Sequence, residues 1–125
     1  MTHCLIVDDS QTIRKIIRRI LEEFSFVCEE AEDGEQAFDL CKKKMPEVIL
    51  LDWNMPKVNG LEFLKSLRAM ENGSLPKVIF CTTENTMEYI KNGMEAGADE
   101  YLMKPFDKVL IASKLVQLGL LEENI

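Results

Sequence analysis

Five polar residues of this sequence lie at the ends of short apolar stretches and could do chemistry together: Asp8, Asp9, Asp52, Thr82 and Lys104. Three carboxylates a few ångströms apart repel one another by about 3–4 kcal/mol per pair at an effective dielectric near 20. Either one of them keeps a proton or a cation lies among them. Because oxygen ligands suit hard cations, these residues predict a site for Mg2+, with Mn2+ and Ca2+ as alternatives.

A carboxylate, a divalent cation, an ammonium and a hydroxyl around one point are the groups that phosphoryl transfer requires. The cation and Lys104 would neutralise the phosphoryl oxygens, and Thr82 would donate a hydrogen bond. Asp52 would be the nucleophile and would form an acyl phosphate. Taken singly, each residue has an ordinary structural explanation; Asp8 and Asp9, for example, could belong to a helix cap. Their joint placement at strand ends favours the chemical interpretation.

The stretch that places Asp52 is the apolar run Val48–Leu51, which is bounded by Pro46 and Pro56. A continuous apolar run of this length is typical of a strand buried on both faces of a parallel sheet. In open α/β sheets, ligands bind at the carboxyl ends of the strands. The sequence therefore predicts that Asp52 lies where a ligand would bind, at the end of a central strand.

Strand-like and helix-like segments alternate five times along the chain. Strands are expected at 4–7, 26–31, 48–52, 77–81 and 100–103, and helices at 13–24, 35–44, 61–67, 86–97 and 109–118. This alternation predicts an α/β fold, a flavodoxin-like doubly wound (βα)5 sandwich whose five-stranded parallel sheet has the order 2-1-3-4-5. In that order strands 1, 3, 4 and 5 are neighbours, so the five polar residues would share one cleft.

Helix ends and helix faces can be predicted too. Ser10 and Thr86 are placed to cap the first and fourth helices, and Gly97 to end the fourth. The apolar spacing also predicts which residues face the core. In the fourth helix these are Met87, Ile90 and Met94, and in the last helix they are Val109, Leu110, Leu115 and Leu118.

Length, composition and charge restrict the class of protein. The 125 residues suit one domain with one core, and a hydrophobic content of 46% is ordinary for a globular protein. The formal net charge of -7 disfavours binding to nucleic acid and to anionic membranes. No apolar run approaches the roughly 20 residues of a membrane span, and no signal peptide is expected. These features predict a cytoplasmic protein.

The cysteines and the histidine predict no further site. None of the four cysteines, Cys4, Cys28, Cys41 and Cys81, forms a C-x-x-C pair with another, and three lie within apolar stretches. Buried, reduced thiols are therefore expected. The single histidine, His3, is expected at a frayed chain end and not as a metal ligand.

Several short motifs occur in a fixed order along the chain: Asp8-Asp9, Ala31-Glu32-Asp33-Gly34, Asp52-Trp53-Asn54-Met55-Pro56, Thr82, Ala96-Gly97-Ala98, Tyr101 and Lys104-Pro105-Phe106. This set resembles the receiver domain of two-component response regulators, and it covers essentially the whole chain. It is most similar to the stand-alone, chemotaxis type of receiver. The resemblance implies one receiver domain over residues 1–125 with no output domain.

The resemblance implies a role for each residue of the acidic site. Asp52 accepts a phosphoryl group from the phosphohistidine of a sensor histidine kinase. Asp9 and Asp52 bind Mg2+ through their side chains, Asp8 binds it mainly through water, and Asn54 binds it through its backbone carbonyl. Lys104 pairs with the phosphoryl group.

The resemblance also implies a switch beside the site. Thr82 turns its hydroxyl toward the phosphoryl group, and Tyr101 then moves inward into the space near Thr82. This movement alters the face formed by the fourth helix, the fifth strand and the fifth helix. The peptide bond between Lys104 and Pro105 is typically cis in the family. From the residues alone, an ordinary aromatic of an edge strand is an alternative interpretation of Tyr101.

Three residues are expected to tune hydrolysis of the acyl phosphate: Asn54, Thr83 and Glu84. Asn54 and Glu84 match the chemotaxis-type pair, which implies a short-lived phosphoryl group. Thr83 stands where the family usually has alanine or glycine, and its branched side chain would narrow the path to Asp52. We therefore expect slower reaction with bulky phosphoryl donors or phosphatases.

Such a receiver is not an enzyme for other substrates, because it catalyses only its own phosphorylation and dephosphorylation. A sensor histidine kinase is expected to dock on the first helix. A downstream target is expected on the face of the fourth helix, the fifth strand and the fifth helix, where Tyr89 and Met94 lie. This target would be a flagellar motor switch or another relay protein. The chain would be a monomer or a phosphorylation-dependent dimer.

Three other functions are alternatives for this fold. A phosphorelay intermediate or phosphate sink would use the same site, and it stays open. An FMN-binding electron carrier needs a Ser/Thr/Gly-rich phosphate loop after the first strand, where this chain has Asp8-Asp9-Ser10. A hydrolase with an aspartyl nucleophile commonly has a second acid two residues further on, and that position is Asn54.

Overall fold

Strands and helices alternate along the chain in a computed structural model that describes residues 2–53, 55, 58–83 and 86–122. The strands are β1 (His3–Val7), β2 (Val27–Ala31), β3 (Val48–Asp52), β4 (Lys77–Thr82) and β5 (Glu100–Met103). The helices are α1 (Gln11–Glu23), α2 (Gly34–Lys43), α3 (Gly60–Ala69), α4 (Met87–Glu95) and α5 (Lys108–Gln117).

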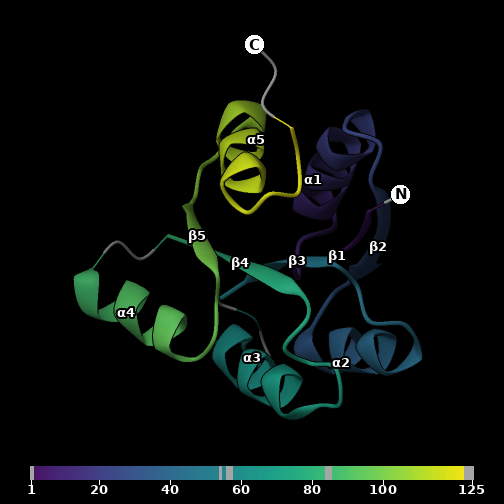
Figure 1. The fold of residues 1–125 in the computed structure, drawn as a ribbon. Helices are drawn as coiled ribbons and strands as arrows, with labels where there is room; N and C mark the ends of the chain where they lie inside the picture. Colours follow the sequence, from purple (N-terminus) through teal and green to yellow (C-terminus); the bar gives the residue numbers. More distant parts are fainter. Residues whose placement is uncertain (1, 54, 56–57, 84–85, 123–125) are drawn as a thin grey trace.

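The five strands form one parallel sheet in the order β2-β1-β3-β4-β5, which confirms the predicted topology. Helices α1 and α5 cover one face of the sheet, and α2, α3 and α4 cover the other (Figure 1). Alternate residues of β3 serve the two faces. Ile49 and Leu51 pack with α2 and α3, whereas Val48 and Leu50 pack with α1 and α5. The central strand is therefore a rigid support for the residue at its end, Asp52.

The predicted helix ends are confirmed. The Ser10 hydroxyl accepts a hydrogen bond from the Ile13 amide at 3.3 Å and caps α1. The Thr86 hydroxyl accepts one from the Tyr89 amide at 3.3 Å and caps α4. Gly97 follows α4 with a φ of +115°, a backbone conformation that side chains other than glycine rarely adopt.

The predicted inward face of α4 is wrong. Met87 is 84% exposed and Met94 is 39% exposed, and only Ile90 of the three is packed against the core. Instead, α4 approaches the sheet through Gly93, where a Cβ atom would lie 2.7 Å from the ring of Phe80. Close approach of the backbone replaces methionine packing, and both methionines face solvent.

The predicted inward face of α5 is confirmed for Leu115 and Leu118 but wrong for Val109 and Leu110. Val109 is 74% exposed and Leu110 is 44% exposed, whereas Ile111 and Leu115 are fully buried. Leu118 packs partly against the same core. The helix begins at Lys108, after its Asp107 cap, and Ile111 lies on the same face as Leu115, one turn earlier.

The cysteines behave as predicted, whereas His3 does not. All four thiols are free and buried. Burial raises the pKa of Cys81 to about 12 and that of Cys41 to about 11, so these thiols stay protonated at neutral pH. His3 is not frayed, since it belongs to β1 and is buried. Within the described ranges, none of the helices combines the length and the apolar character needed to cross a bilayer.

Candidate functional site

Three carboxylates converge at the carboxyl edge of the sheet, as predicted. Asp8 and Asp9 follow β1, and Asp52 ends the neighbouring strand β3. One oxygen atom from each carboxylate lies within 4.8 Å of the other two. Asp8 and Asp52 are buried, whereas Asp9 is exposed. The cluster therefore has two acids fixed in the protein and one at its opening to solvent.

Lys104 supplies a positive charge to this cluster from the end of β5. Its Nζ atom lies 3.1 Å from Oδ2 of Asp8 and 3.2 Å from Oδ1 of Asp52. Burial alone would lower the pKa of Lys104, but attraction to Asp52 and Asp8 and the two hydrogen bonds outweigh it and raise the pKa. Lys104 therefore stays charged between the two acids. The predicted cis bond to Pro105 is present.

The cluster fits a hard divalent cation. Its three potential ligand groups are carboxylates, the oxygen donors that Mg2+ prefers. The exposed position of Asp9 leaves room for the waters that Mg2+ usually retains. Asp8, Asp9 and Asp52 are the described residues that would hold the ion. Asn54, the fourth predicted ligand, lies outside the described residues.

Thr82 and Tyr101 lie on neighbouring strands beside the cluster. Thr82 ends β4 and is fully buried. Tyr101 lies in β5, partly buried, with its ring 6.1 Å from that of Phe80 and 4.9 Å from Nζ of Lys114. The structure thus brings Thr82 to the predicted edge and Tyr101 to the predicted neighbouring strand. The movement of Tyr101 stays a prediction.

An aromatic chain that the sequence analysis missed connects the site to Tyr101. The ring of Trp53, which directly follows Asp52, lies 4.7 Å from the ring of Phe80 and 6.4 Å from that of Tyr89. Phe80 in turn packs near Tyr101. The signal available in the sequence was the position of Trp53 immediately after the predicted nucleophile.

A hollow of about 270 Å³ lies beside Lys104, between α1 and the segment after β5. Its lining is largely apolar and includes Thr83, Ile13, Ile16 and Phe106. Ile16 is 51% exposed, so an apolar surface of α1 is open to solvent next to the site. Thr83 is exposed at the rim, whereas Glu84 lies outside the described residues. The predicted tuning role of Thr83 is therefore compatible with its position.

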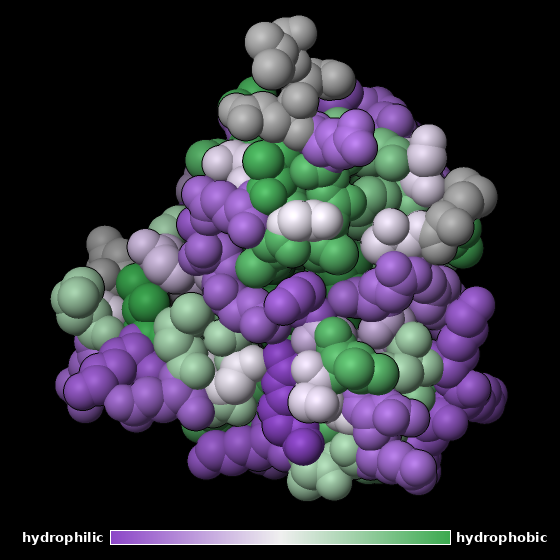
Figure 2. Space-filling model, in the orientation of Figure 1, coloured by the Kyte–Doolittle hydropathy of each residue, from purple (hydrophilic) through white to green (hydrophobic). Residues whose placement is uncertain are grey.

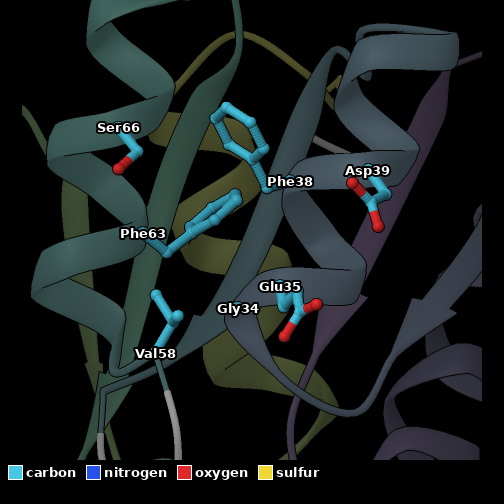
Figure 3. Close-up of a pocket in the computed structure, with 7 residues that line it drawn as sticks. All are labelled: Gly34, Glu35, Phe38, Asp39, Val58, Phe63 and Ser66. Carbon is cyan, nitrogen blue, oxygen red and sulfur yellow. The ribbon is translucent and has the colours of Figure 1, made fainter.

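A second hollow, of about 260 Å³, lies between α2 and α3 (Figure 3). The rings of Phe38 and Phe63 point into it, and the carboxylates of Glu35 and Asp39 lie on its α2 side. None of the residues that line it belongs to the predicted site. The chemistry is therefore concentrated at the carboxyl edge of the sheet.

Comparison with known families identifies the class of protein that this fold and acidic edge define. Residues 4–116 match the response regulator receiver domain. The chain belongs to the response regulator receiver domain family. This match confirms the family resemblance that the ordered motifs of the sequence indicated.

Among known relatives, the chain is similar to CheY-type proteins. It is 38% identical over 112 residues to protein CcdB of Bacillus subtilis, across 89% of this chain and 92% of that protein. It is 37% identical over 112 residues to chemotaxis protein CheY-3 of Vibrio cholerae, across 89% of this chain and 86% of that protein. It is a CheY-like receiver domain.

Solved structures agree with this assignment. Chemotaxis response regulator CheY4 of Vibrio cholerae superposes with a TM-score of 0.90 and 32% identity, across 94% of this chain and 98% of that one. The receiver domain of a sensor histidine kinase from Pseudomonas aeruginosa gives a TM-score of 0.85 and 26% identity, across 93% and 95%. That structure has a magnesium ion coordinated in its active-site cleft.

Proposed function

We propose that this chain is a cytoplasmic response regulator that accepts a phosphoryl group from a sensor histidine kinase on Asp52, in a Mg2+-dependent reaction. The observation that carries the proposal is the convergence of Asp8, Asp9 and Asp52 with Lys104 at one edge of the sheet. Membership of the receiver family and the magnesium ion in the Pseudomonas aeruginosa receiver support it.

In the proposed reaction, a carboxylate oxygen of Asp52 attacks the phosphorus atom of a phosphohistidine. The new O–P bond forms as the N–P bond of the donor breaks, and the imidazole nitrogen keeps the bonding electrons and takes up a proton. Mg2+, when bound, supplies positive charge that stabilises the phosphoryl oxygens in the transition state. Lys104 supplies a second positive charge, and its raised pKa keeps it protonated. The product is an acyl phosphate on Asp52, and the chain acts on no other substrate.

The donor would approach over α1. The hollow beside Lys104 presents the apolar side chains of Ile13, Ile16 and Phe106 next to the acidic cluster. An apolar surface at this point could contact the donor protein while its phosphohistidine reaches Asp52. The position of Thr83 at the same hollow supports its proposed effect on bulky donors.

The output would be phosphorylation-dependent binding of a target protein, of the chemotaxis type. Thr82 would report the phosphoryl group to Tyr101, and Tyr101 would alter the face made by α4, β5 and α5. That face presents Met87 and Leu110 to solvent. Apolar side chains also gather between α5 and α1 near the top of Figure 2. The similarity to CheY-3 supports a chemotaxis target over a relay protein.

Incubation with acetyl phosphate and Mg2+ tests the proposal. The wild-type protein should gain the mass of one phosphoryl group, and the gain should disappear with EDTA or in Asp52→Asn. Asp39→Asn, which changes an exposed aspartate of α2, is the matched control and should be modified like the wild type. Unchanged modification of Asp52→Asn would show that another residue is the nucleophile.

A further inference from the structure

Asp8 is held through each of its backbone and side-chain polar groups. Its amide donates to the Ala31 carbonyl at 3.1 Å. Its Oδ1 atom accepts from the Ser10 amide at 2.8 Å, and its Oδ2 atom accepts from Lys104 at 3.1 Å. Its backbone carbonyl accepts from Nη1 of Arg14 at 2.7 Å. Of these partners, Arg14 is the one whose side chain reaches the peptide that follows Asp8.

That peptide joins the two acids of the β1–α1 loop. The carbonyl of Asp8 and the amide of Asp9 belong to one rigid planar unit. A hydrogen bond that fixes this carbonyl therefore fixes the direction in which the chain enters Asp9. Because Asp9 is exposed, the packing of its own side chain contributes little to its position. Its orientation toward Asp8 and Asp52 depends on the backbone.

Arg14 is itself held in place by Glu30 of β2. Its Nε atom lies 3.0 Å from Oε1 of Glu30, and its side chain is only 12% exposed. Glu30 also accepts from Nη1 of Arg18 at 2.8 Å through its other oxygen. Arg18 holds the pKa of Glu30 below its usual range, against the effect of burial and with help from Arg14. Glu30 is therefore a charged anchor for Arg14.

We propose that Arg14, oriented by Glu30, is a positioning residue for the metal site: it fixes the Asp8–Asp9 peptide and thereby sets the affinity for Mg2+. The inference rests on the proposed function, since it assumes that the cluster binds Mg2+. Residues that orient metal ligands without touching the metal typically contribute about 10–100-fold to metal affinity. The planar guanidinium suits this task because Nη1 and Nε can serve the carbonyl and the carboxylate at once.

The charge of Arg14 cannot explain such an effect by itself. A nearby cation should weaken Mg2+ binding, so loss of Arg14 by electrostatics alone would strengthen it. The geometry predicts the opposite sign, because the loss of the hydrogen bond frees the Asp8–Asp9 peptide. The direction of the change in Mg2+ affinity therefore separates positioning from charge.

The test is Mg2+ affinity in Arg14→Gln and in the control Arg18→Gln, both compared with the wild type. Arg18 shares Glu30 with Arg14, but its contacts in the described residues are to Glu30 and Glu22 instead of Asp8. Affinity is measured from the fluorescence of Trp53, the single tryptophan of the sequence, and from the Mg2+ dependence of the unfolding temperature. Glu30→Gln, which keeps the shape of the side chain, serves as a second variant if Arg14→Gln does not fold.

Arg14→Gln should bind Mg2+ about 10-fold more weakly, and Arg18→Gln should stay close to the wild type. Glu30→Gln should change affinity in the same direction as Arg14→Gln. Phosphorylation by acetyl phosphate should need correspondingly more Mg2+ in Arg14→Gln but reach the wild-type rate at saturation. If Arg14 served only the stability of the fold, Arg14→Gln would not combine a higher Mg2+ requirement with a wild-type rate of phosphorylation at saturating Mg2+.

Unchanged or stronger Mg2+ binding in Arg14→Gln would overturn the inference, and so would equal weakening in Arg18→Gln. Either result leaves the proposed function intact as long as the wild type binds Mg2+. Failure of the wild type to bind Mg2+ would instead remove the proposed function and this inference together.

Discussion

The two edges of the sheet use charge in different ways. At the amino edge, Arg68 pairs with Asp99 at 3.1 Å, one cation with one anion. At the carboxyl edge, Asp8 and Asp52 share the ammonium of Lys104, and Asp9 is a third acid within the same cluster. The first arrangement is balanced, whereas the second has an excess of negative charge.

The balanced pair connects loops of the amino edge. Arg68 donates to the carbonyls of Gly97, Gly73 and Pro76 at 2.7–3.1 Å. Asp99 also accepts from the amide of Val78 at 2.8 Å, at the start of β4. These groups satisfy one another within the protein, so this edge needs no ligand. The excess charge at the opposite edge is relieved when a cation binds, and this difference separates a structural cluster from a site.

Loss of Arg68 should have the largest effect on stability. Arg68→Ala removes the donors of several partly buried carbonyls and leaves Asp99 without its cation, which should lower the free energy of unfolding by about 2–3 kcal/mol. Mg2+ affinity should not change. Urea denaturation measures the first quantity and Mg2+ titration the second, with the exposed Arg19→Ala as control. A large loss of Mg2+ affinity in the folded variant would contradict the division between the edges.

Loss of one acid of the carboxyl edge should weaken Mg2+ binding without lowering the stability of the metal-free protein. Asp9→Asn removes a charged ligand, so Mg2+ affinity should fall about 10-fold or more. The metal-free protein should become slightly more stable, because repulsion among the three acids decreases. Mg2+ titration and denaturation in EDTA measure the two effects. If the metal-free variant were less stable than the wild type, the charge of Asp9 would be compensated within the protein, as Arg68 compensates that of Asp99.

Replacement of Thr83 should have a smaller effect, on rate. Thr83→Ala removes a branched side chain at the rim of the hollow beside Lys104 and should speed phosphorylation by a bulky donor a few-fold. Acetyl phosphate, a small donor, should show a smaller change. Stopped-flow measurement of Trp53 fluorescence gives both rates. Equal rates for variant and wild type with the bulky donor would count against a narrowed path.

The smallest effect expected near neutral pH concerns the titration of Lys104. Because its pKa is raised in the folded protein, its contribution to stability is fully present below its ordinary value of 10.5 and is lost as pH rises through the folded-state value. The difference in unfolding free energy between the wild type and Lys104→Met should be constant near neutral pH and shrink in alkaline solution. A difference that shrinks on acidification to mildly acidic pH instead would show that another group controls it.

Elements with strong local signals could be predicted from the sequence. The apolar run before Asp52, the capping residues Ser10 and Thr86 and the alternation of strands and helices led to the correct topology and to the acidic edge. These features depend on local spacing and on the rule that parallel strands share one carboxyl edge. The carboxylates therefore met where the sequence predicted.

Features that depend on tertiary contacts could not be predicted. Helix α4 packs through Gly93 on Phe80, so the spacing of its methionines was misleading. The hydrogen bond from Arg14 to the Asp8 carbonyl cannot be recognised in the sequence, since arginines at that spacing also occur on the solvent-exposed face of an ordinary helix. Both depend on how closely two elements approach, which local patterns do not record.

The most direct test of the central claim is to locate the phosphoryl group on the chain. The protein is incubated with acetyl phosphate and Mg2+, reduced with borohydride so that an aspartyl phosphate becomes homoserine, and digested for mass spectrometry. Homoserine at position 52, absent when EDTA replaces Mg2+, is the predicted result. Homoserine at position 8 or 9, or modification of position 52 that persists in EDTA, would contradict the claim that the excess charge at the carboxyl edge serves a Mg2+-dependent acceptor.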